Sequence, residues 1–312
     1  MIRLRALACG ALVVASSVAG AQTRLVIVSG IGGQPKYSRE FAEWSTRLAQ
    51  AARDRAGLPE SAIVWLGDST SKKSPWYRGP SLRDTVEGTL ARLADGPPTD
   101  QVVLVLSGHG SGEGEDTRVS LPGPDMTAKD FARILARFGS RRVAFVNLTS
   151  ASGDMAPLLA APGRVVMTAT KSAFERNESH FARFFVDALS RDGADTDKDN
   201  RVSLLEAFRY AEAETKRFYD SDGRLATEHA QIADASQLAR QFFLTPGASA
   251  RGGADASLTT HYADRFALDE QLQALKKRKA EMTVDAYEGE LERLLIALAL
   301  NAREIRRLEK GA

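Results

Sequence analysis

QVVLVLSGHGSG, residues 101–112, is the strongest structural signal in this sequence. Its apolar residues 102–106 alternate too little for a half-exposed strand, so they predict a strand buried on both faces of a parallel sheet. The run ends abruptly in Ser-Gly-His-Gly. We therefore expect His109 at the carboxyl end of a central strand, where open α/β sheets hold their ligands and catalytic groups.

Strand and helix signals alternate along residues 22–244, which predicts a mostly parallel sheet with helices on both faces. The expected strands are residues 25–29, 62–66, 102–106, 143–148 and 164–168. The expected helices are residues 38–56, 82–93, 127–138, 180–189 and 204–218. Residues 69–80 are expected to form a polar loop. The glycine turn at residues 30–33 lacks the dinucleotide and phosphate-loop fingerprints, so it is expected to be a plain tight turn.

Residues 1–21 have the pattern of a cleaved secretory signal peptide. Arg3 and Arg5 precede the apolar run 6–19, and the run ends in small residues at positions 19–21. A membrane anchor would need about 20 apolar residues, and this run is shorter. The mature chain is therefore expected to begin near Gln22, to be periplasmic or extracellular, and to keep no membrane span.

Removal of the signal would also change the charge and the cysteine content. Only Arg3 and Arg5 would leave, so the formal charge would fall from +2 to zero, with 40 acidic residues balanced by as many basic ones. This balance does not indicate a nucleic-acid partner. Cys9 is the only cysteine, so the mature chain should contain no thiol and no disulfide.

A second strand end repeats the pattern of the first. The expected strand 143–148 runs into Thr149-Ser150-Ala151-Ser152-Gly153, a small, hydroxyl-rich turn closed by glycine. The helix between the two strands should begin at the N-cap Thr127, with Asp130 three residues later. Two successive sheet strands are thus expected to end in residues whose side chains could take part in catalysis or ligand binding.

This pair of strand ends resembles the caspase–legumain group of peptidases, including exported bacterial caspase-like domains. In that group one strand runs into a His-Gly pair, and the next ends in a catalytic cysteine, a variable residue, Ser or Ala, and Gly. His109 and Gly110 match the first element. Residues 150–153 match the second, with Ser150 where the cysteine would be.

The resemblance covers roughly residues 24–220, and residues 164–173 look like the family strand and loop that contribute to the substrate cleft. It implies a caspase-like three-layer α/β sandwich with a mostly parallel central sheet. It also implies that His109, Ser150 and Gly110 form the catalytic site, with His109 serving largely the leaving group. The Gly110 N–H would help to stabilise the oxyanion, and such a donor is worth about 3 to 4 kcal/mol in hydrolases.

Serine at the cysteine position limits what this site could do. A thiol with a pKa near 8.5 ionises readily, whereas a serine hydroxyl needs an adjacent base in hydrogen-bond contact. Ser150 could be a structural serine in a peptidase homologue that binds a peptide or protein with impaired or lost hydrolysis, which is the hypothesis that we favour. It could instead be the nucleophile of a serine-dependent endopeptidase with His109 as base, or a turn residue beside an unrelated binding cleft.

Residues 195–206, DTDKDNRVSLLE, have the spacing of a calcium-binding loop. Oxygen-bearing side chains occupy loop positions one, three, five, nine and twelve, and a backbone carbonyl can serve position seven. The expected ligands in that order are Asp195, Asp197, Asp199, the Arg201 carbonyl, Ser203 and Glu206. We expect a structural Ca²⁺, for which Mg²⁺ could substitute, and zinc is not indicated. The alternative is an acidic, solvated helix start capped by Ser203, which leaves the full spacing unexplained.

The other histidines, His180, His229 and His261, have no paired metal-ligand spacing. Each is expected to be a surface or capping histidine. His180 could also line a specificity pocket, because it follows the expected cleft strand.

Residues 245–258 are rich in Gly, Ala and Ser and are expected to be a flexible linker. Residues 259–312 carry apolar side chains at helical spacing and should form a helical hairpin or coiled coil. Its apolar stripe must be buried against itself, the main domain or another chain. A calcium-stabilised interaction module that acts through this tail is therefore a further alternative function. The basic residues 276–279 lie among acidic ones and are expected to be a solvated helix face.

Overall fold

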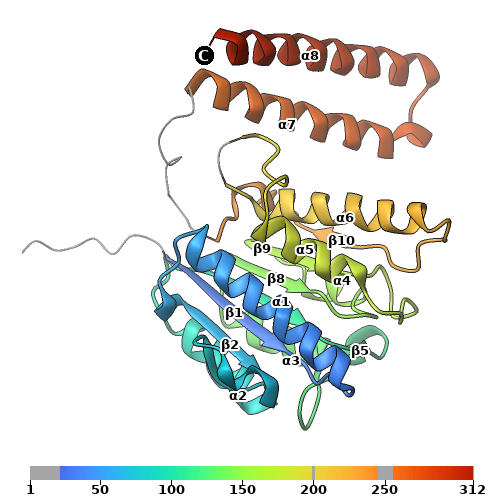
Figure 1. Ribbon diagram of the computed structural model, residues 1–312. Helices are drawn as coiled ribbons and strands as arrows, with labels where there is room; N and C mark the ends of the chain where they lie inside the picture. Colours follow the sequence, from blue (N-terminus) through green and yellow to red (C-terminus); the bar gives the residue numbers. More distant parts are fainter. Residues whose placement is uncertain (1–21, 199–200, 245–255, 312) are drawn as a thin grey trace, which may run out of the picture.

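The computed structural model describes residues 22–198, 201–244 and 256–311 (Figure 1). Within them, a seven-stranded sheet has the order β10-β9-β8-β4-β1-β2-β3. All its pairings are parallel except that of β10 with β9. The strands are β1 (Thr23–Ser29), β2 (Ile63–Gly67), β3 (Tyr77–Pro80), β4 (Gln101–Ser107), β8 (Val143–Asn147), β9 (Arg164–Thr168) and β10 (Gln231–Ala233). The predicted α/β class with a mostly parallel sheet is confirmed.

Helices cover both faces of this sheet (Figure 1). One face carries α1 (Pro35–Asp54), α5 (His180–Ser190) and α6 (Leu204–Ser221). The other carries α2 (Arg83–Ala94), α3 (Ala128–Ala136) and α4 (Met155–Leu159). The central strand β4 supplies both cores: Val103 and Val105 point into the first, and Val102, Leu104 and Leu106 into the second. This division explains why residues 102–106 are apolar without alternation.

Shorter elements complete the described chain. A second sheet with the order β5-β6-β7 follows β4 and consists of β5 (Gly110–Ser111), β6 (Arg118–Val119) and β7 (Met126–Thr127). The 3₁₀ helices are η1 (Glu60–Ala62), η2 (Ser69–Lys73), η3 (Gly114–Asp116), η4 (Ala239–Gln241) and η5 (Lys279–Glu281). The expected loop 69–80 is therefore partly ordered into η2 and the edge strand β3. The Trp76 carbonyl anchors this segment, because it accepts a hydrogen bond from Trp65 of β2 at 3.0 Å.

The expected start of α3 is confirmed by its cap. The Thr127 hydroxyl accepts a hydrogen bond from the Asp130 backbone at 3.2 Å, and the Asp130 carboxylate accepts one from the Thr127 backbone at 3.0 Å. This reciprocal pair satisfies two N–H groups that the helix itself leaves without acceptors. A purely local signal was sufficient to predict it.

The C-terminal segment contains the helices α7 (Ala256–Lys277) and α8 (Val284–Gly311). They pack on each other through a small apolar cluster formed by Leu268, Leu272, Leu275, Met282, Tyr287, Leu291, Leu294 and Leu298. Part of the apolar stripe is thus buried within the hairpin itself. Residues 245–255 of the expected linker lie outside the described residues, and α7 begins before the predicted end of that linker.

Two further expectations concern residues outside this description. The expected signal, residues 1–21, and the loop residue Asp199 both lie outside it. Among the described helices, none combines the length and the apolar character needed to cross a membrane.

Candidate functional site

Four strand ends meet along one edge of the sheet. β1, β4, β8 and β9 are neighbours in that order and run parallel, so the segments that follow them leave from the same edge. The chain order reverses between β1 and β4, because β2 and β3 lie on one side of this pair and β8 and β9 on the other. Open α/β sheets bind ligands at such a switch point. We call the group formed by His109, Gly110 and Ser150 the strand-end site.

His109 follows β4 and faces the turn that follows β1. Its Nε2 lies 3.1 Å from the Gly32 carbonyl oxygen. A carbonyl can only accept, so Nε2 carries the proton in this contact. The half-buried ring packs edge-on against Tyr37 and Phe41 of α1, with ring centroids 4.9 and 5.3 Å away. The imidazole is therefore held by the β1 turn and by α1.

Ser150 follows β8 and is 6% exposed. Its Oγ accepts a hydrogen bond from the Gly110 backbone N–H at 3.3 Å and lies 3.5 Å from the Gly110 carbonyl oxygen. Within the described residues, no hydrogen bond joins His109 to Ser150. The fold thus brings the expected site residues to one place, and the hydroxyl contacts Gly110 while the imidazole contacts Gly32.

Close backbone packing explains the two glycines of the matched motifs. A Cβ on Gly110 would lie 2.2 Å from the Ser150 carbonyl oxygen and 2.7 Å from Oγ1 of Thr149. A Cβ on Gly153 would lie 2.1 Å from the Lys171 carbonyl carbon. Both distances are shorter than real contacts allow, so these positions require glycine for packing alone.

The segment after β9 fixes the turn at residues 150–153. Thr170 Oγ1 accepts hydrogen bonds from the Ser152 and Gly153 backbones at 2.8 and 3.0 Å. The Ala151 N–H donates to the Glu175 carbonyl at 2.8 Å, and Ala151 adopts a left-handed conformation with φ 50°. The expected cleft segment therefore does adjoin the strand-end site.

A carboxylate–histidine pair beside this turn was missed in the sequence. His229 Nδ1 lies 2.6 Å from Oε1 of Glu175, and Oε2 of Glu175 accepts from the Lys171 and His229 backbones at 2.9 and 3.0 Å. His229 is a surface histidine as expected, because its side chain is 49% exposed. Its partner is 54 residues away in the chain, and no local pattern connects the two.

Acidic residues lie beside the aromatic contacts of His109. The Tyr37 hydroxyl is 3.5 Å from Oε2 of Glu178, which also pairs with Lys36 at 3.3 Å. Burial and the nearby Glu178 raise the pKa of Glu40. Among the described atoms, Glu40 Oε2 is buried without a hydrogen-bond partner. The α1 side of the site is thus partly apolar and partly acidic.

Within the described residues, no hydrogen bond or ring contact joins His180 to the strand-end site. It packs between α5 and α6, with its ring centroid 4.1 Å from that of Phe218 and 5.8 Å from that of Tyr219. Burial lowers its pKa, against the opposing effect of Glu228. The expected specificity role has no support from these contacts.

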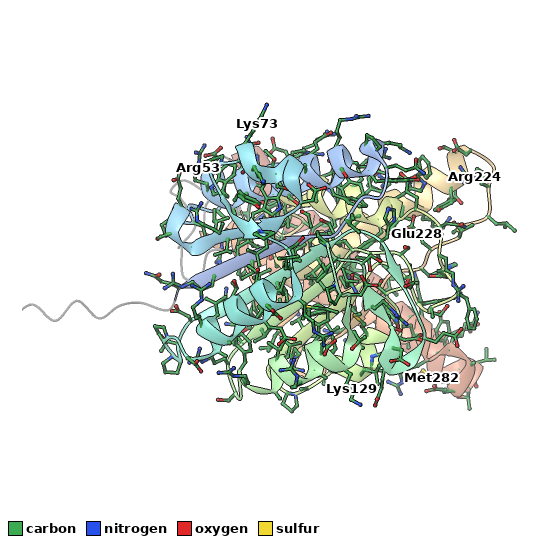
Figure 2. All side chains as sticks on the ribbon, turned by 90° about the horizontal axis from the view of Figure 1, so that it is seen from below. Arg53, Lys73, Lys129, Arg224, Glu228 and Met282 are labelled. Atoms are coloured by element: carbon green, nitrogen blue, oxygen red, sulfur yellow. The ribbon has the colours of Figure 1, made fainter. Side chains whose placement is uncertain are left out.

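Glu228, which is labelled in Figure 2, was not singled out in the sequence. Its exposed fraction is 4%. Its carboxylate accepts hydrogen bonds from the Ser179 hydroxyl at 2.8 Å and from the His180 and Phe181 backbones at 2.8 and 3.1 Å. It satisfies the free N–H groups at the start of α5 and places a negative charge at the positive end of the helix dipole. Its role is therefore structural.

The predicted calcium loop brings three of its carboxylates together. Oxygen atoms of Asp195, Asp197 and Glu206 lie within 4.8 Å of one another. Glu206 is also the partner of Ser203 in the capping box of α6, and its Oε1 accepts from the Thr196 backbone at 2.8 Å. Lys198 bends the loop through a left-handed conformation with φ 58°. Carboxylate oxygens are the ligand type that hard cations prefer, and Glu206 and Ser203 also have a helix-capping role.

No protein-family model matches the chain, and no curated protein matches it. Among solved structures, the chain is similar to the crystal structure of drICE, a caspase, with 10% sequence identity and a TM-score of 0.40. The match covers 68% of this chain and 86% of that chain. A likeness at this level carries no residue roles.

Proposed function

We propose that this protein is an exported, caspase/legumain-like peptidase homologue that binds a peptide or protein at the strand-end site without hydrolysing it efficiently. One observation carries the proposal: Ser150 Oγ is hydrogen-bonded to Gly110, and His109 Nε2 to the Gly32 carbonyl. A serine nucleophile needs its base within about 3 Å of the hydroxyl. Both groups have other partners instead.

The chemistry of each group is consistent with lost hydrolysis. The His109 nitrogen that contacts Gly32 donates a proton there, which leaves Nδ1 as the ring nitrogen that could accept one, and within the described residues no hydrogen bond joins Nδ1 to Ser150. The Gly110 N–H would have to stabilise an oxyanion, but it is engaged by the serine hydroxyl. Activity would require the Gly110–Ser150 hydrogen bond to break and Nδ1 of His109 to come within reach of the Ser150 hydroxyl.

Surface features near the site fit a peptide ligand. Ile31 precedes Gly32 and is 42% exposed, and Phe174 precedes Glu175 and is 76% exposed. Ile31 follows β1 and Phe174 follows β9, and these strands flank β4 and β8, which lead to His109 and Ser150. The Glu175–His229 pair adds polar groups beside Phe174. A peptide with an apolar side chain and with unpaired backbone N–H and C=O groups would use both the apolar and the polar contacts.

Hydrolysis is tested with purified protein and two probes, a serine-reactive fluorophosphonate and a diverse peptide library read by mass spectrometry. We expect no label at Ser150 and no cleaved peptide. Labelling that His109→Ala abolishes, together with cleavage, would overturn the proposal. It would establish the alternative, an active serine-dependent endopeptidase.

Binding is tested with peptides selected from a displayed library on the intact protein. We expect a selected peptide to bind Phe174→Ser at least about tenfold more weakly, because a large apolar contact is lost. The matched control is Val284→Ser on α8, which also removes an exposed apolar side chain, 69% exposed, and should not change the affinity. If no peptide binds, the alternative of an interaction module that acts through the helical tail is favoured.

We also propose that residues 195–206 bind one structural Ca²⁺, on the basis of their ligand spacing. Because Glu206 caps α6, its substitution would destabilise the protein with or without calcium. The test therefore uses Asp195→Asn with Asp197→Asn. We expect added Ca²⁺ to raise the melting temperature of the parent protein but not of this variant. The control, Asp192→Asn with Asp222→Asn, removes the same charge outside the loop and should respond as the parent does.

A further inference from the structure

The outward face of α8 carries an ordered sequence of charges and apolar groups. All members of this set are exposed, and Leu295, Ile296 and Leu300 are 49, 53 and 48% exposed. We call the set the outer stripe, and it consists of Asp285, Glu288, Glu292, Leu295, Ile296, Ala299, Leu300, Arg303 and Arg307. Its first three members are acidic, the next four are apolar and the last two are basic.

The outer stripe is a continuous surface of the helix. At 3.6 residues per turn, its members fall within an arc of about 140°. The residues that pack on α7, including Leu291, Leu294 and Leu298, fall on the opposite side. Residues 294–300, LLIALAL, are consequently apolar on all sides. A helix segment of this kind is normally buried on all sides, but within this hairpin only one side is covered.

We propose that α8 pairs through the outer stripe with α8 of a second copy, in antiparallel orientation about a two-fold axis near Ala297. In this register Leu295 faces Leu300 of the second copy. Glu292 faces Arg303 of the second copy, and Glu288 faces its Arg307. Each contact occurs twice because the axis is two-fold. This pairing does not depend on the function of the strand-end site.

Charge order selects a second copy of this chain as the partner. The stripe is complementary to itself only when antiparallel, since a parallel pair would place acid against acid and base against base. The apolar centre would supply most of the association free energy, and the exposed ion pairs would supply the register. Arg303 and Arg307 already contact Glu304 at 3.8 and 2.7 Å within the helix, but exposed pairs of this kind exchange at little cost.

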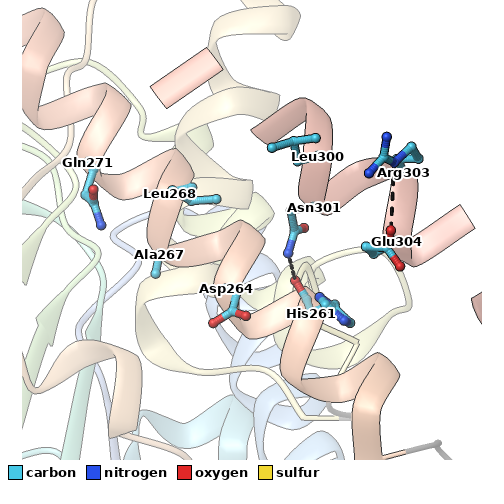
Figure 3. A pocket seen from close by; sticks show the side chains of 9 residues that line it. All are labelled: His261, Asp264, Ala267, Leu268, Gln271, Leu300, Asn301, Arg303 and Glu304. Atoms are coloured by element: carbon cyan, nitrogen blue, oxygen red, sulfur yellow. Dashed lines mark hydrogen bonds and ion pairs between the residues drawn. The ribbon is translucent and has the colours of Figure 1, made fainter. Parts of the chain in front are cut away.

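A groove between α7 and α8 borders the apolar centre (Figure 3). Leu300 lines it together with Ala267 and Leu268 of α7. The Asn301 side-chain amide closes one part of the groove by donating to the His261 carbonyl at 2.9 Å. In the proposed pair, Leu295 of the second copy reaches this groove beside Leu300, as a knob enters a hole in a coiled coil.

The pairing is tested by analytical ultracentrifugation of the full chain over a range of concentrations. We expect a reversible monomer–dimer equilibrium. Glu288→Arg with Glu292→Arg should raise the dissociation constant by about tenfold or more, since each arginine would face an arginine. Adding Arg303→Glu and Arg307→Glu to that variant should restore the dimer. Asp192→Arg with Glu212→Arg, outside the hairpin, is the control for added charge and should not change the equilibrium.

Two results would overturn the proposal: a chain that stays monomeric at every concentration, or a dimer indifferent to the charge reversals. Circular dichroism checks that α7 and α8 keep their helicity in each variant, and the restored dimer excludes misfolding as the cause of dissociation.

Orientation is tested by a spin label at Ala286→Cys, in a Cys9→Ser background that leaves no other thiol. In the antiparallel pair the two labels are separated by about 35 Å, because 286 faces 309 and a helix rises about 1.5 Å per residue. In a parallel pair they would be about 10 Å apart. Electron double resonance distinguishes these distances, and the shorter one would contradict the proposed geometry.

Discussion

The backbone N–H of Gly110 donates a hydrogen bond to Oγ of Ser150 at 3.3 Å. This contact joins the end of β4 to the end of β8. In a hydrolase the same N–H would be directed at a developing oxyanion, where such a donor is worth about 3 to 4 kcal/mol. Here the donor and the hydroxyl satisfy each other, so both residues also have a structural role that is independent of catalysis.

Gly110→Ala is expected to destabilise the protein by about 2 to 3 kcal/mol, since its Cβ would lie 2.2 Å from the Ser150 carbonyl oxygen. The melting temperature should fall by roughly 5 to 10 °C in a thermal scan. Gly88→Ala is the matched control, because no atom other than those of its chain neighbours and the backbone of α2 lies within 4 Å of its Cβ position. Gly88 is exposed and lies inside α2, so alanine there should instead increase the free energy of unfolding by about 0.5 to 1 kcal/mol. Equal effects of the two substitutions would rule out the close approach at Gly110.

The parts predictable from sequence are those whose cause is local. The run 102–106 marks β4 because its side chains fill two cores, and the Thr127–Asp130 cap lies within one helical turn. By contrast, β10 is short and half-buried, and it is a strand only because it pairs with β9. Its sequence has no alternation long enough to reveal it.

In the strand-end site too, some features could be predicted from the sequence and others depend on the tertiary fold. His109 and Ser150 could be located because the ends of parallel strands share one edge of the sheet. The Gly32 carbonyl that holds His109 could not, since a backbone oxygen has no sequence signature. The Glu175–His229 pair depends on the placement of residues 54 positions apart, which only the tertiary fold determines.

Glu228→Gln is expected to destabilise the protein by about 1 to 3 kcal/mol. The amide NH₂ of glutamine would replace one carboxylate oxygen, so it would face N–H or O–H donors at the start of α5. The stability is measured by urea unfolding. Glu178→Gln is the control for loss of a carboxylate, because its pair with Lys36 is exposed and should contribute little to stability. If Glu228→Gln left the stability unchanged, these donors would have found other acceptors.

Glu40→Gln is expected to raise the melting temperature by roughly 1 to 3 °C at about pH 7 and to have little effect at about pH 4. Burial raises the pKa of Glu40 above its ordinary value of 4.5. The folded state therefore keeps the proton while the unfolded state loses it, so stability falls as the pH rises from the unfolded to the folded pKa. Glu43→Gln, an exposed position on the same helix, should show no such difference. A uniform effect of Glu40→Gln at both pH values would exclude titration as its cause.

His180 should make the protein less stable in mild acid. Burial lowers its pKa below the ordinary value of 6.5, and its ring packs on Phe218. Between the unfolded and the lowered folded pKa, only the unfolded chain takes up the proton, so stability is complete above about pH 6.5 and falls as the pH decreases. His180→Phe and His180→Gln remove this titration, although they differ in packing. The melting temperature of each variant minus that of the parent should therefore increase as the pH is lowered from about 8 to about 5. If only one of them does, packing rather than protonation of His180 governs the acid sensitivity.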